Sequence, residues 1–163
     1  MQMQLMRTIL FASVILPDAA GLAQIAELVP RPEISPQQVV QYQVCSLQHN
    51  DEPHVDAGIE RTYRFASPSN KGQTGPLGRF ALMVKSPAYS PIVDNLASSI
   101  VGSRIDGDHA KIAIKVAPEK GAPLIYLFML SRQHGAEFND CWMTDAVLPI
   151  QKGEKLPKGA LAI

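Results

Sequence analysis

The amino-acid sequence predicts an α+β fold in which three helices precede a curved antiparallel sheet of about four strands. Two observations lead to this prediction. Between residues 35 and 87 the apolar residues recur every three or four positions, which is typical of amphipathic helices. From residue 96 onward the period becomes two, which is typical of half-buried strands. Helices and strands that occupy separate halves of a chain indicate an α+β protein.

Length and composition favour one globular domain. The chain has 163 residues, of which 46% are hydrophobic and 18% charged, as in ordinary folded proteins. Fifteen basic and fifteen acidic side chains balance, so the basic excess typical of nucleic-acid-binding domains is missing, and we expect no nucleic-acid partner. We divide the chain into a targeting or docking segment with a linker (1–34), the domain (35–150) and an exposed tail with three lysines (151–163).

The first 23 residues have the layout of a targeting segment. Arg7 precedes an apolar run, Ile9 to Leu16, and small residues follow up to Ala23, as in a secretory signal. The same stretch also fits the remnant of a plastid import sequence, or a short helix that docks on a partner or a membrane surface. The run is shorter than the roughly 20 apolar residues that span a bilayer. We therefore expect an exported or organellar protein if the segment is removed, and a cytoplasmic one otherwise.

The first helix of the domain is predicted from Ser35 to about His49. Ser35 is suited to cap the free amides of the first turn, Pro36 suits the first helical position, and Gln38 completes a capping box. The apolar stripe of this helix consists of Val40, Val44 and Leu47. We expect this stripe to pack against the sheet.

Two further helices are predicted on either side of a loop. The second begins after Asp56, a plausible N-cap, and ends near Pro68, which cannot continue a helix. We expect residues 71–73 to form the loop, and Thr74 to cap the third helix, which stops before Pro87. The inward-facing residues of the two helices are predicted to be Ile59, Tyr63, Phe65, Leu77, Phe80, Ala81 and Val84.

Four strands are predicted in the second half of the chain. Their ranges are Leu96–Ile105, His109–Ala117, Leu124–Leu130 and Cys141–Ile150. Asp106 and Gly107 form a tight turn between the first two strands. The third strand is apolar on both faces, so we expect it to be central and covered on both sides. A curved sheet around the first helix would leave a cavity between the sheet and the helices.

Three segments between residues 35 and 147 carry a family resemblance. They read SPQQVVQYQVCSLQHND, AGIERTYRFASPSNKGQTGPLGRFALMV and CWMTD. The chain resembles the uncharacterised bacterial and plastid-lineage family DUF4864, which is similar to the NTF2-like, or cystatin-like cone, superfamily. The resemblance implies a cone of curved sheet and helices, often paired through the sheet. Because the family has no assigned activity, the resemblance implies no catalytic residue.

Few residues suggest chemistry. The sequence has no phosphate-binding loop, no GxSxG motif and no histidine spacing suited to a metal, so we expect neither metal nor cofactor. Acid–base chemistry in a cone pocket needs an ionisable group held in apolar surroundings. The catalytic candidates are Asp145 and Tyr126, and the predicted pocket residues are Tyr63, Arg79, Phe80, Tyr126 and Trp142. A structural interpretation competes, in which the tyrosines belong to the core and Arg79 pairs with Asp145 or with backbone.

The two cysteines allow two interpretations. Cys45 and Cys141 are either separate buried thiols or, in an oxidising compartment, one disulfide bridge. Neither lies in a context that activates a thiol: Cys45 falls inside a predicted helix, and Cys141 begins a predicted strand.

The function expected from these features is that of a non-catalytic binding or assembly module, an accessory subunit of a larger complex. It would contact a protein partner or a second copy through the sheet face, and a membrane only through that complex or through the first residues. The alternative is a small-molecule enzyme or carrier, of isomerase, dehydratase or hydrolase type, that takes an apolar ligand in the cone pocket. A buried, unpaired carboxylate or histidine in an open pocket would favour the enzyme, and a filled or closed pocket with exposed apolar sheet surface would favour the module.

Overall fold

The computed structural model describes residues 28–150, which form an α+β fold with four α-helices and one four-stranded sheet. The helices are α2 (Pro36–Gln48), α3 (Ala57–Arg64), α4 (Pro68–Thr74) and α5 (Leu77–Val84), followed by the short 3-10 helix η1 (Ser90–Ile92). The strands are β1 (Ala97–Asp106), β2 (His109–Ala117), β3 (Leu124–Arg132) and β4 (Trp142–Ile150). The predicted targeting segment, 1–23, and the predicted tail, 151–163, lie outside the described residues.

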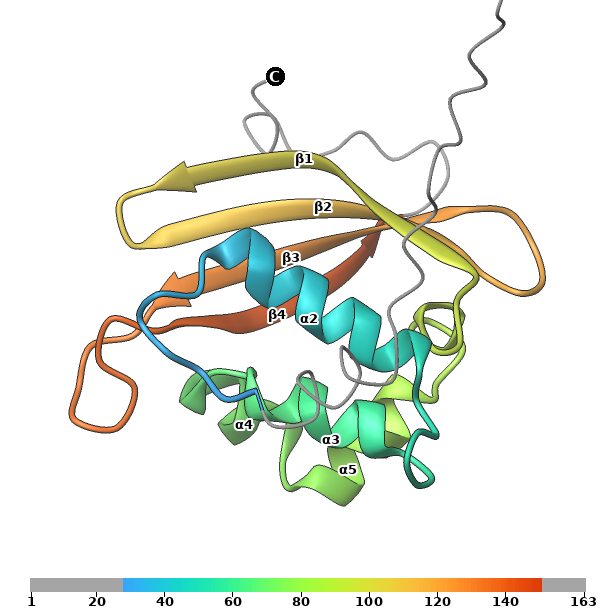
Figure 1. The fold of residues 1–163 in the computed structure, drawn as a ribbon, viewed down its shortest axis with the longest axis horizontal. Helices are drawn as coiled ribbons and strands as arrows, with labels where there is room; N and C mark the ends of the chain where they lie inside the picture. Colours follow the sequence, from blue (N-terminus) through green and yellow to red (C-terminus); the bar gives the residue numbers. More distant parts are fainter. Residues whose placement is uncertain (1–27, 151–163) are drawn as a thin grey trace, which may run out of the picture.

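Helix α2 begins and packs as the sequence predicts. The Ser35 hydroxyl accepts a hydrogen bond from the Gln38 amide at 3.3 Å, and the Gln38 side chain accepts one from the Ser35 amide at 2.9 Å, so the capping box is complete. The predicted apolar stripe is buried throughout. Figure 1 shows α2 lying along the sheet, with α3, α4 and α5 on its other side.

The segment between α3 and α5 differs from the prediction. Residues 71–73, predicted as a loop, belong to helix α4, and Thr74 is the last residue of this helix rather than the cap of the next. The Ser67 hydroxyl caps α4 by accepting a hydrogen bond from the Asn70 amide at 3.1 Å, and Pro68 occupies the first helical position. A proline there loses no hydrogen bond, so Pro68 starts a new helix where it was expected only to end one.

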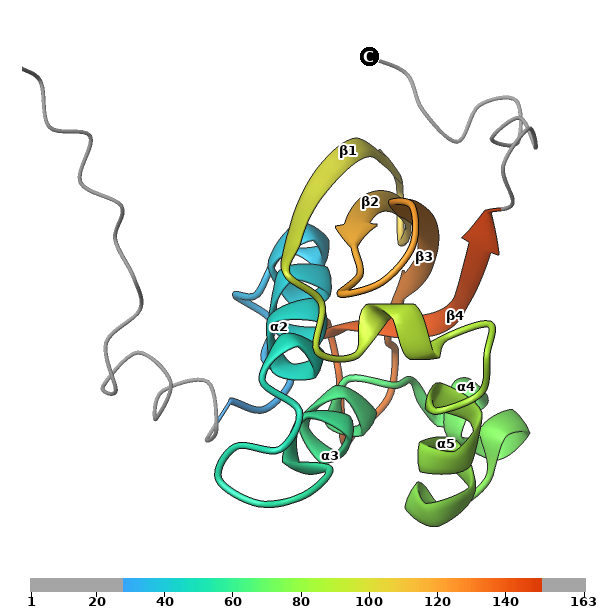
Figure 2. The same cartoon turned by 90° about the vertical axis from the view of Figure 1, so that its right-hand side faces the viewer.

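The sheet confirms the four predicted strands. Each begins and ends within two residues of its predicted range, and the order is β1-β2-β3-β4 with every pair antiparallel. Asp106 ends β1, and Gly107 follows with a φ of 57°, as expected for the predicted tight turn. Figure 2 shows how strongly the sheet curls.

The core lies between α2 and one face of the sheet. On β2 it uses Ala110, Ile112, Ile114 and Val116, and on β3 Tyr126, Phe128 and Leu130. Leu127, whose side chain alternates to the opposite face, is also only 1% exposed, but Ile125 and Met129 on that face are half-buried, so β3 is buried on the α2 face and only partly on the other. Within residues 28–150, no helix has the length and apolar character needed to cross a membrane.

Candidate functional site

A cavity of about 200 Å³ lies between the helices and β4. Its wall includes residues of α2 to α5, of the segment around η1, and of β3 and β4, because α4 packs on β4 while α5 packs on α3 and α4. In Figure 2 these three helices lie below β4. The lining includes Gln73, which is exposed, and Leu148, which is 43% exposed, so the cavity reaches the protein surface.

A β-bulge brings the only carboxylate among the described lining residues to the cavity. In the register of β3 with β4, Met129 pairs with Ala146 and Leu130 pairs with Thr144, so Asp145 has no partner across the ladder. Such an extra residue bends its strand and changes the direction of nearby side chains. Asp145 is half-buried and lines the cavity next to Thr144. Its carboxylate makes no hydrogen bond or ion pair with any residue between 28 and 150.

The inner wall of the cavity is neutral and internally hydrogen-bonded. The Thr144 hydroxyl, 1% exposed, donates to the Gln43 side-chain oxygen at 2.7 Å. The Gln43 side-chain amide donates to the Thr62 carbonyl at 3.1 Å, and the Thr62 hydroxyl donates to the Gln43 carbonyl at 3.2 Å. The Asn70 amide side chain donates to the Thr144 carbonyl at 3.1 Å. These groups hold the helices on β4, and their mutual bonding makes the wall a preformed surface.

Three aromatic side chains contribute to the remaining wall. They are Phe80 from α5, Tyr89 from the segment before η1, and Phe128 from β3. The Tyr89 hydroxyl donates to the Val147 carbonyl at 3.0 Å, which fixes the ring beside the bulged strand. Aromatic faces carry partial negative charge, so this part of the wall is apolar but attractive to cations.

Two of the residues named from the sequence line this cavity: Phe80 and Asp145. The others do not belong to its lining. The Tyr63 hydroxyl donates to the Gly75 carbonyl at 3.1 Å, and Arg79 is exposed on α5 with its stem beside Gly75.

Tyr126 and Trp142 both serve the core. The Tyr126 hydroxyl donates to the Ala88 carbonyl at 3.1 Å, and burial, with the neighbouring Tyr89, raises the pKa of Tyr126 to about 12. A phenol with this pKa stays protonated at neutral pH and is suited to donate a hydrogen bond rather than to act as a base. Trp142 is 5% exposed and lies under the Arg132 guanidinium, which is 5.2 Å from the ring centroid.

Sequence reasoning missed most of the lining. Gln43 and Thr144 carry no motif, and they meet only because α2 crosses β4, 101 positions apart in the chain. Tyr89 lies in the Pro-containing connection between α5 and β1, which carries no motif. One usable indication existed: Gln43 is a polar residue close to the apolar stripe of α2, which points to a buried hydrogen-bond partner.

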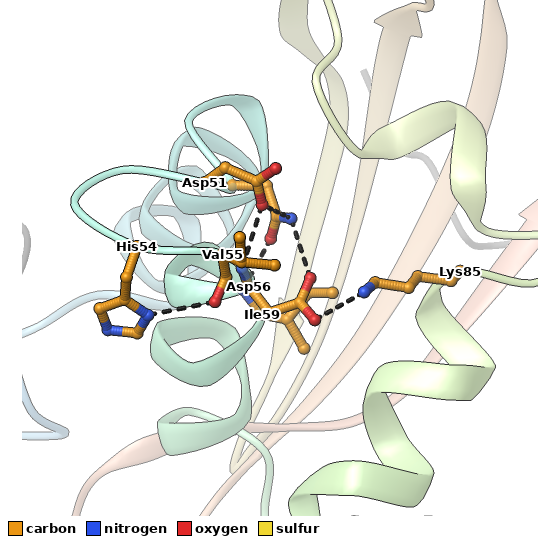
Figure 3. A network of polar contacts seen from close by, with 7 residues as sticks. Asp51, His54, Val55, Asp56, Ile59 and Lys85 are labelled. Carbon is orange, nitrogen blue, oxygen red and sulfur yellow. Dashed lines mark hydrogen bonds and ion pairs between the residues drawn. The ribbon is translucent and has the colours of Figure 1, made fainter.

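A second, more open depression holds an ion pair between two of its lining residues. It is lined by Asp51, Asp56, Asp94 and Lys85, among others. Figure 3 shows the Asp56 carboxylate between Lys85 and the loop after α2: it accepts a hydrogen bond from the Lys85 ammonium at 2.6 Å and from the Asn50 side chain at 3.2 Å.

Asp56 precedes α3 as predicted, but its side chain does not cap the helix because it makes these bonds instead. The hydrogen bond from Lys85 is the main cause that lowers the pKa of Asp56. Within the described part of the chain, no three His, Cys, Asp or Glu residues are grouped as a metal site would require.

Both cysteines are free thiols. Cys45 is half-buried in α2, and Cys141 is buried just before β4. Burial raises the pKa of both thiols, so neither is activated as a nucleophile. Of the two interpretations of the cysteines, the structure shows separate thiols.

Comparison of the chain with protein-family models, with curated proteins and with solved structures finds no match. The resemblance to the DUF4864 family and to the NTF2-like cone therefore stays a prediction. Conclusions about function depend on the chemistry of the cavity itself.

Proposed function

We propose that the chain is a small-molecule-binding protein of NTF2-like cone architecture that holds a ligand in the cavity beside β4. The observation that carries the proposal is the cavity of about 200 Å³, which is open to solvent and has a largely apolar wall. Its buried polar groups already bond to one another, so the cavity keeps its form without a ligand. Pockets for small molecules are concave, mostly apolar and largely preformed.

Support for the cone comes from the arrangement of the elements. A meander of four antiparallel strands curls over one long helix, and the shorter helices close one end beside β4 (Figure 2). The family resemblance of residues 35–147 points in the same direction. In a cone of this kind the space between the sheet and the helices is the natural place for a ligand.

Binding fits the wall better than catalysis does. Proton transfer requires a positioned acid or base, usually with a second group that orients it. Among the described lining residues the ionisable side chains are Asp145 and Tyr89, and the Tyr89 hydroxyl donates to the Val147 carbonyl. Asp145 therefore stands without an orienting partner from residues 28–150, which suits a binding contact.

The test is a binding titration with a neutral apolar probe, benzyl alcohol, followed by NMR of the isotope-labelled full chain. We expect saturable shifts of the amide signals of residues 144–148 and of Ala66, with no shift in β1. Met83→Trp, which enlarges a half-buried lining residue of α5, should abolish these shifts by filling the cavity. Leu82→Trp adds the same side chain at the adjacent position, which is 74% exposed and outside the lining, and should leave them unchanged.

Two outcomes would contradict the proposal. One is the absence of any saturable shift in the wild-type chain. The other is unchanged binding by a folded Met83→Trp variant, which would place the probe outside the cavity. Circular dichroism of both tryptophan variants establishes that they are folded.

Assembly through the sheet is a second candidate function, favoured by a specific surface. On the face opposite α2, Ile125, Met129 and Ile150 are only half-buried, and Leu148 is 43% exposed. Sedimentation velocity of the full chain, compared with that of Met129→Glu, tests this candidate. A dimer that the substitution dissociates would support assembly, and a monomer in both cases would leave the cavity as the functional feature.

A further inference from the structure

The charge of the cavity wall selects among possible ligands. Asp145 is the single carboxylate among its described residues, and the wall they form includes no Lys, Arg or His. The polar side chains that share the wall are amides and hydroxyls, which carry no net charge. A ligand in this cavity therefore meets a negative charge without a compensating positive one among the described lining residues.

The position of Asp145 is set by the backbone rather than by an ion pair. Met129 and Leu130 of β3 pair with Ala146 and Thr144 of β4, so Asp145 is the extra residue of a bulge in β4. A half-buried carboxylate loses part of its hydration, which is unfavourable unless a partner replaces it. A ligand that supplies a positive charge would replace that hydration, whereas an anionic ligand would be repelled.

The aromatic residues of the wall favour the same kind of ligand. Phe80, Tyr89 and Phe128 line the cavity together with Asp145. Aromatic faces attract ammonium groups, most strongly where water is excluded, and also offer apolar contact to the rest of a ligand. A cavity whose lining combines one carboxylate with several aromatic rings is thus complementary to an ammonium group on an apolar body.

We propose that the cavity binds a small organic cation, an amine or quaternary ammonium compound with an apolar body, through Asp145 and the aromatic residues Phe80, Tyr89 and Phe128. This inference depends on the proposed function, because it names the class of ligand for the same cavity. Apolar contact with the walls gives the basal affinity, and the carboxylate together with the aromatic faces gives the preference for a positive charge. The cavity should accordingly discriminate between ligands of equal shape by their charge alone.

The experiment compares three probes of nearly the same shape: benzyltrimethylammonium, its neutral carbon analogue neopentylbenzene, and phenylmethanesulfonate. Affinities come from NMR titrations of the full chain at one ionic strength. We expect the cation to bind about tenfold more tightly than the neutral probe, as a desolvated cation–π and ion-pair contact would produce, and the sulfonate to bind more weakly than both.

Two matched variants assign this preference to Asp145. Asp145→Asn keeps the shape of the side chain and removes its charge, so the affinity for the cation should fall several-fold towards that of the neutral probe, and only the part of the preference that the aromatic faces supply should remain. Asp106→Asn removes the same charge from the exposed last residue of β1, outside the cavity lining, and should leave the preference unchanged. Because Asp145 has no partner among residues 28–150, the Asn variant should fold normally.

The outcomes separate this inference from the proposed function. Equal affinities for the cation and the neutral probe, or a preference that is undiminished in Asp145→Asn, would overturn the cation inference and leave ligand binding in place. Failure of all three probes to shift the amide signals of residues 144–148 would overturn both. A preference that Asp106→Asn also removes would assign the effect to the general charge of the protein and overturn the role of Asp145.

Discussion

Gly58 lies where helix α3 approaches helix α2 closely. A methyl group at this position of α3 would lie 2.0 Å from the Ser46 carbonyl oxygen of α2, well inside van der Waals contact. The Gly58 amide donates to the Asn50 carbonyl at 2.8 Å, which holds the two helices at this distance. Only a residue without a Cβ atom permits this approach.

We therefore expect Gly58→Ala to destabilise the protein by roughly 3 kcal/mol, because the backbones of α2 and α3 must separate. The measurement is the free energy of unfolding in a denaturant titration. Gly78→Ala is the matched control: it also lies in a helix, α5, but an added methyl group meets no atom within 4 Å. The control should be neutral or stabilise by up to about 1 kcal/mol. Equal effects at the two positions would contradict the close approach.

At the scale of elements, α4 is a seven-residue helix that depends on contacts at its ends. Isolated helices of this length are unstable in water. The Ser67 amide donates to the Thr144 carbonyl at 2.9 Å, and the Ser67 hydroxyl accepts from the Asn70 amide. The cap of α4 is thus joined to β4 at the wall of the cavity.

Ser67→Ala should destabilise α4 by about 1 kcal/mol, because the Asn70 amide loses its partner. Hydrogen exchange should show faster exchange in residues 68–74 than in the wild type, while the amides of β2 and β3 change only with global stability. Ser69→Ala, an exposed position of the same helix, serves as the control and should have little effect. If both serines could be replaced without a change in exchange, the cap would not stabilise α4.

At the scale of the whole molecule, the ion pair of Asp56 and Lys85 joins the loop after α2 to the end of α5 (Figure 3). The pKa of Asp56 is lowered in the folded state, first by the hydrogen bond from Lys85. A carboxyl whose pKa is lowered by folding stabilises the protein above its unfolded pKa of about 4. That contribution is lost as the pH falls through the folded-state pKa.

We expect the stability of the wild type to fall as the pH drops below about 4. Asp56→Asn should lack this part of the pH dependence and should be less stable than the wild type at neutral pH. The difference should be modest and should shrink in high salt, because the Lys85 side chain is 48% exposed. Thermal unfolding over a pH series measures both effects, with Asp106→Asn as the exposed control. A pH profile of Asp56→Asn identical to that of the wild type would show that the pair does not contribute.

Features that depend on residues close in the sequence were predicted correctly, whereas a feature that depends on a contact between distant residues was not. The capping box of α2 and the alternation in β2 depend on neighbours within a few positions, so both were predicted correctly. Thr74 was predicted wrongly, because proline and threonine are compatible with both the end and the start of a helix. In the structure, residues 68–74 form a helix whose cap, Ser67, is bonded to Thr144, more than seventy positions away in the chain.

By itself, the sequence determined the division into helices and strands, the bounds of the four strands and the apolar stripe of α2, because periodicity and capping are properties of the local chain. Only the tertiary structure decided that α4 is a helix, that Asp145 lies in a bulge, and which residues line the cavity. Phe80 and Asp145 were named in advance, but their neighbours Gln43, Tyr89 and Thr144 come from three distant segments. Which side chains share a cavity depends on how α2 to α5 pack on the sheet, and residue types along the chain do not encode that arrangement in any local pattern.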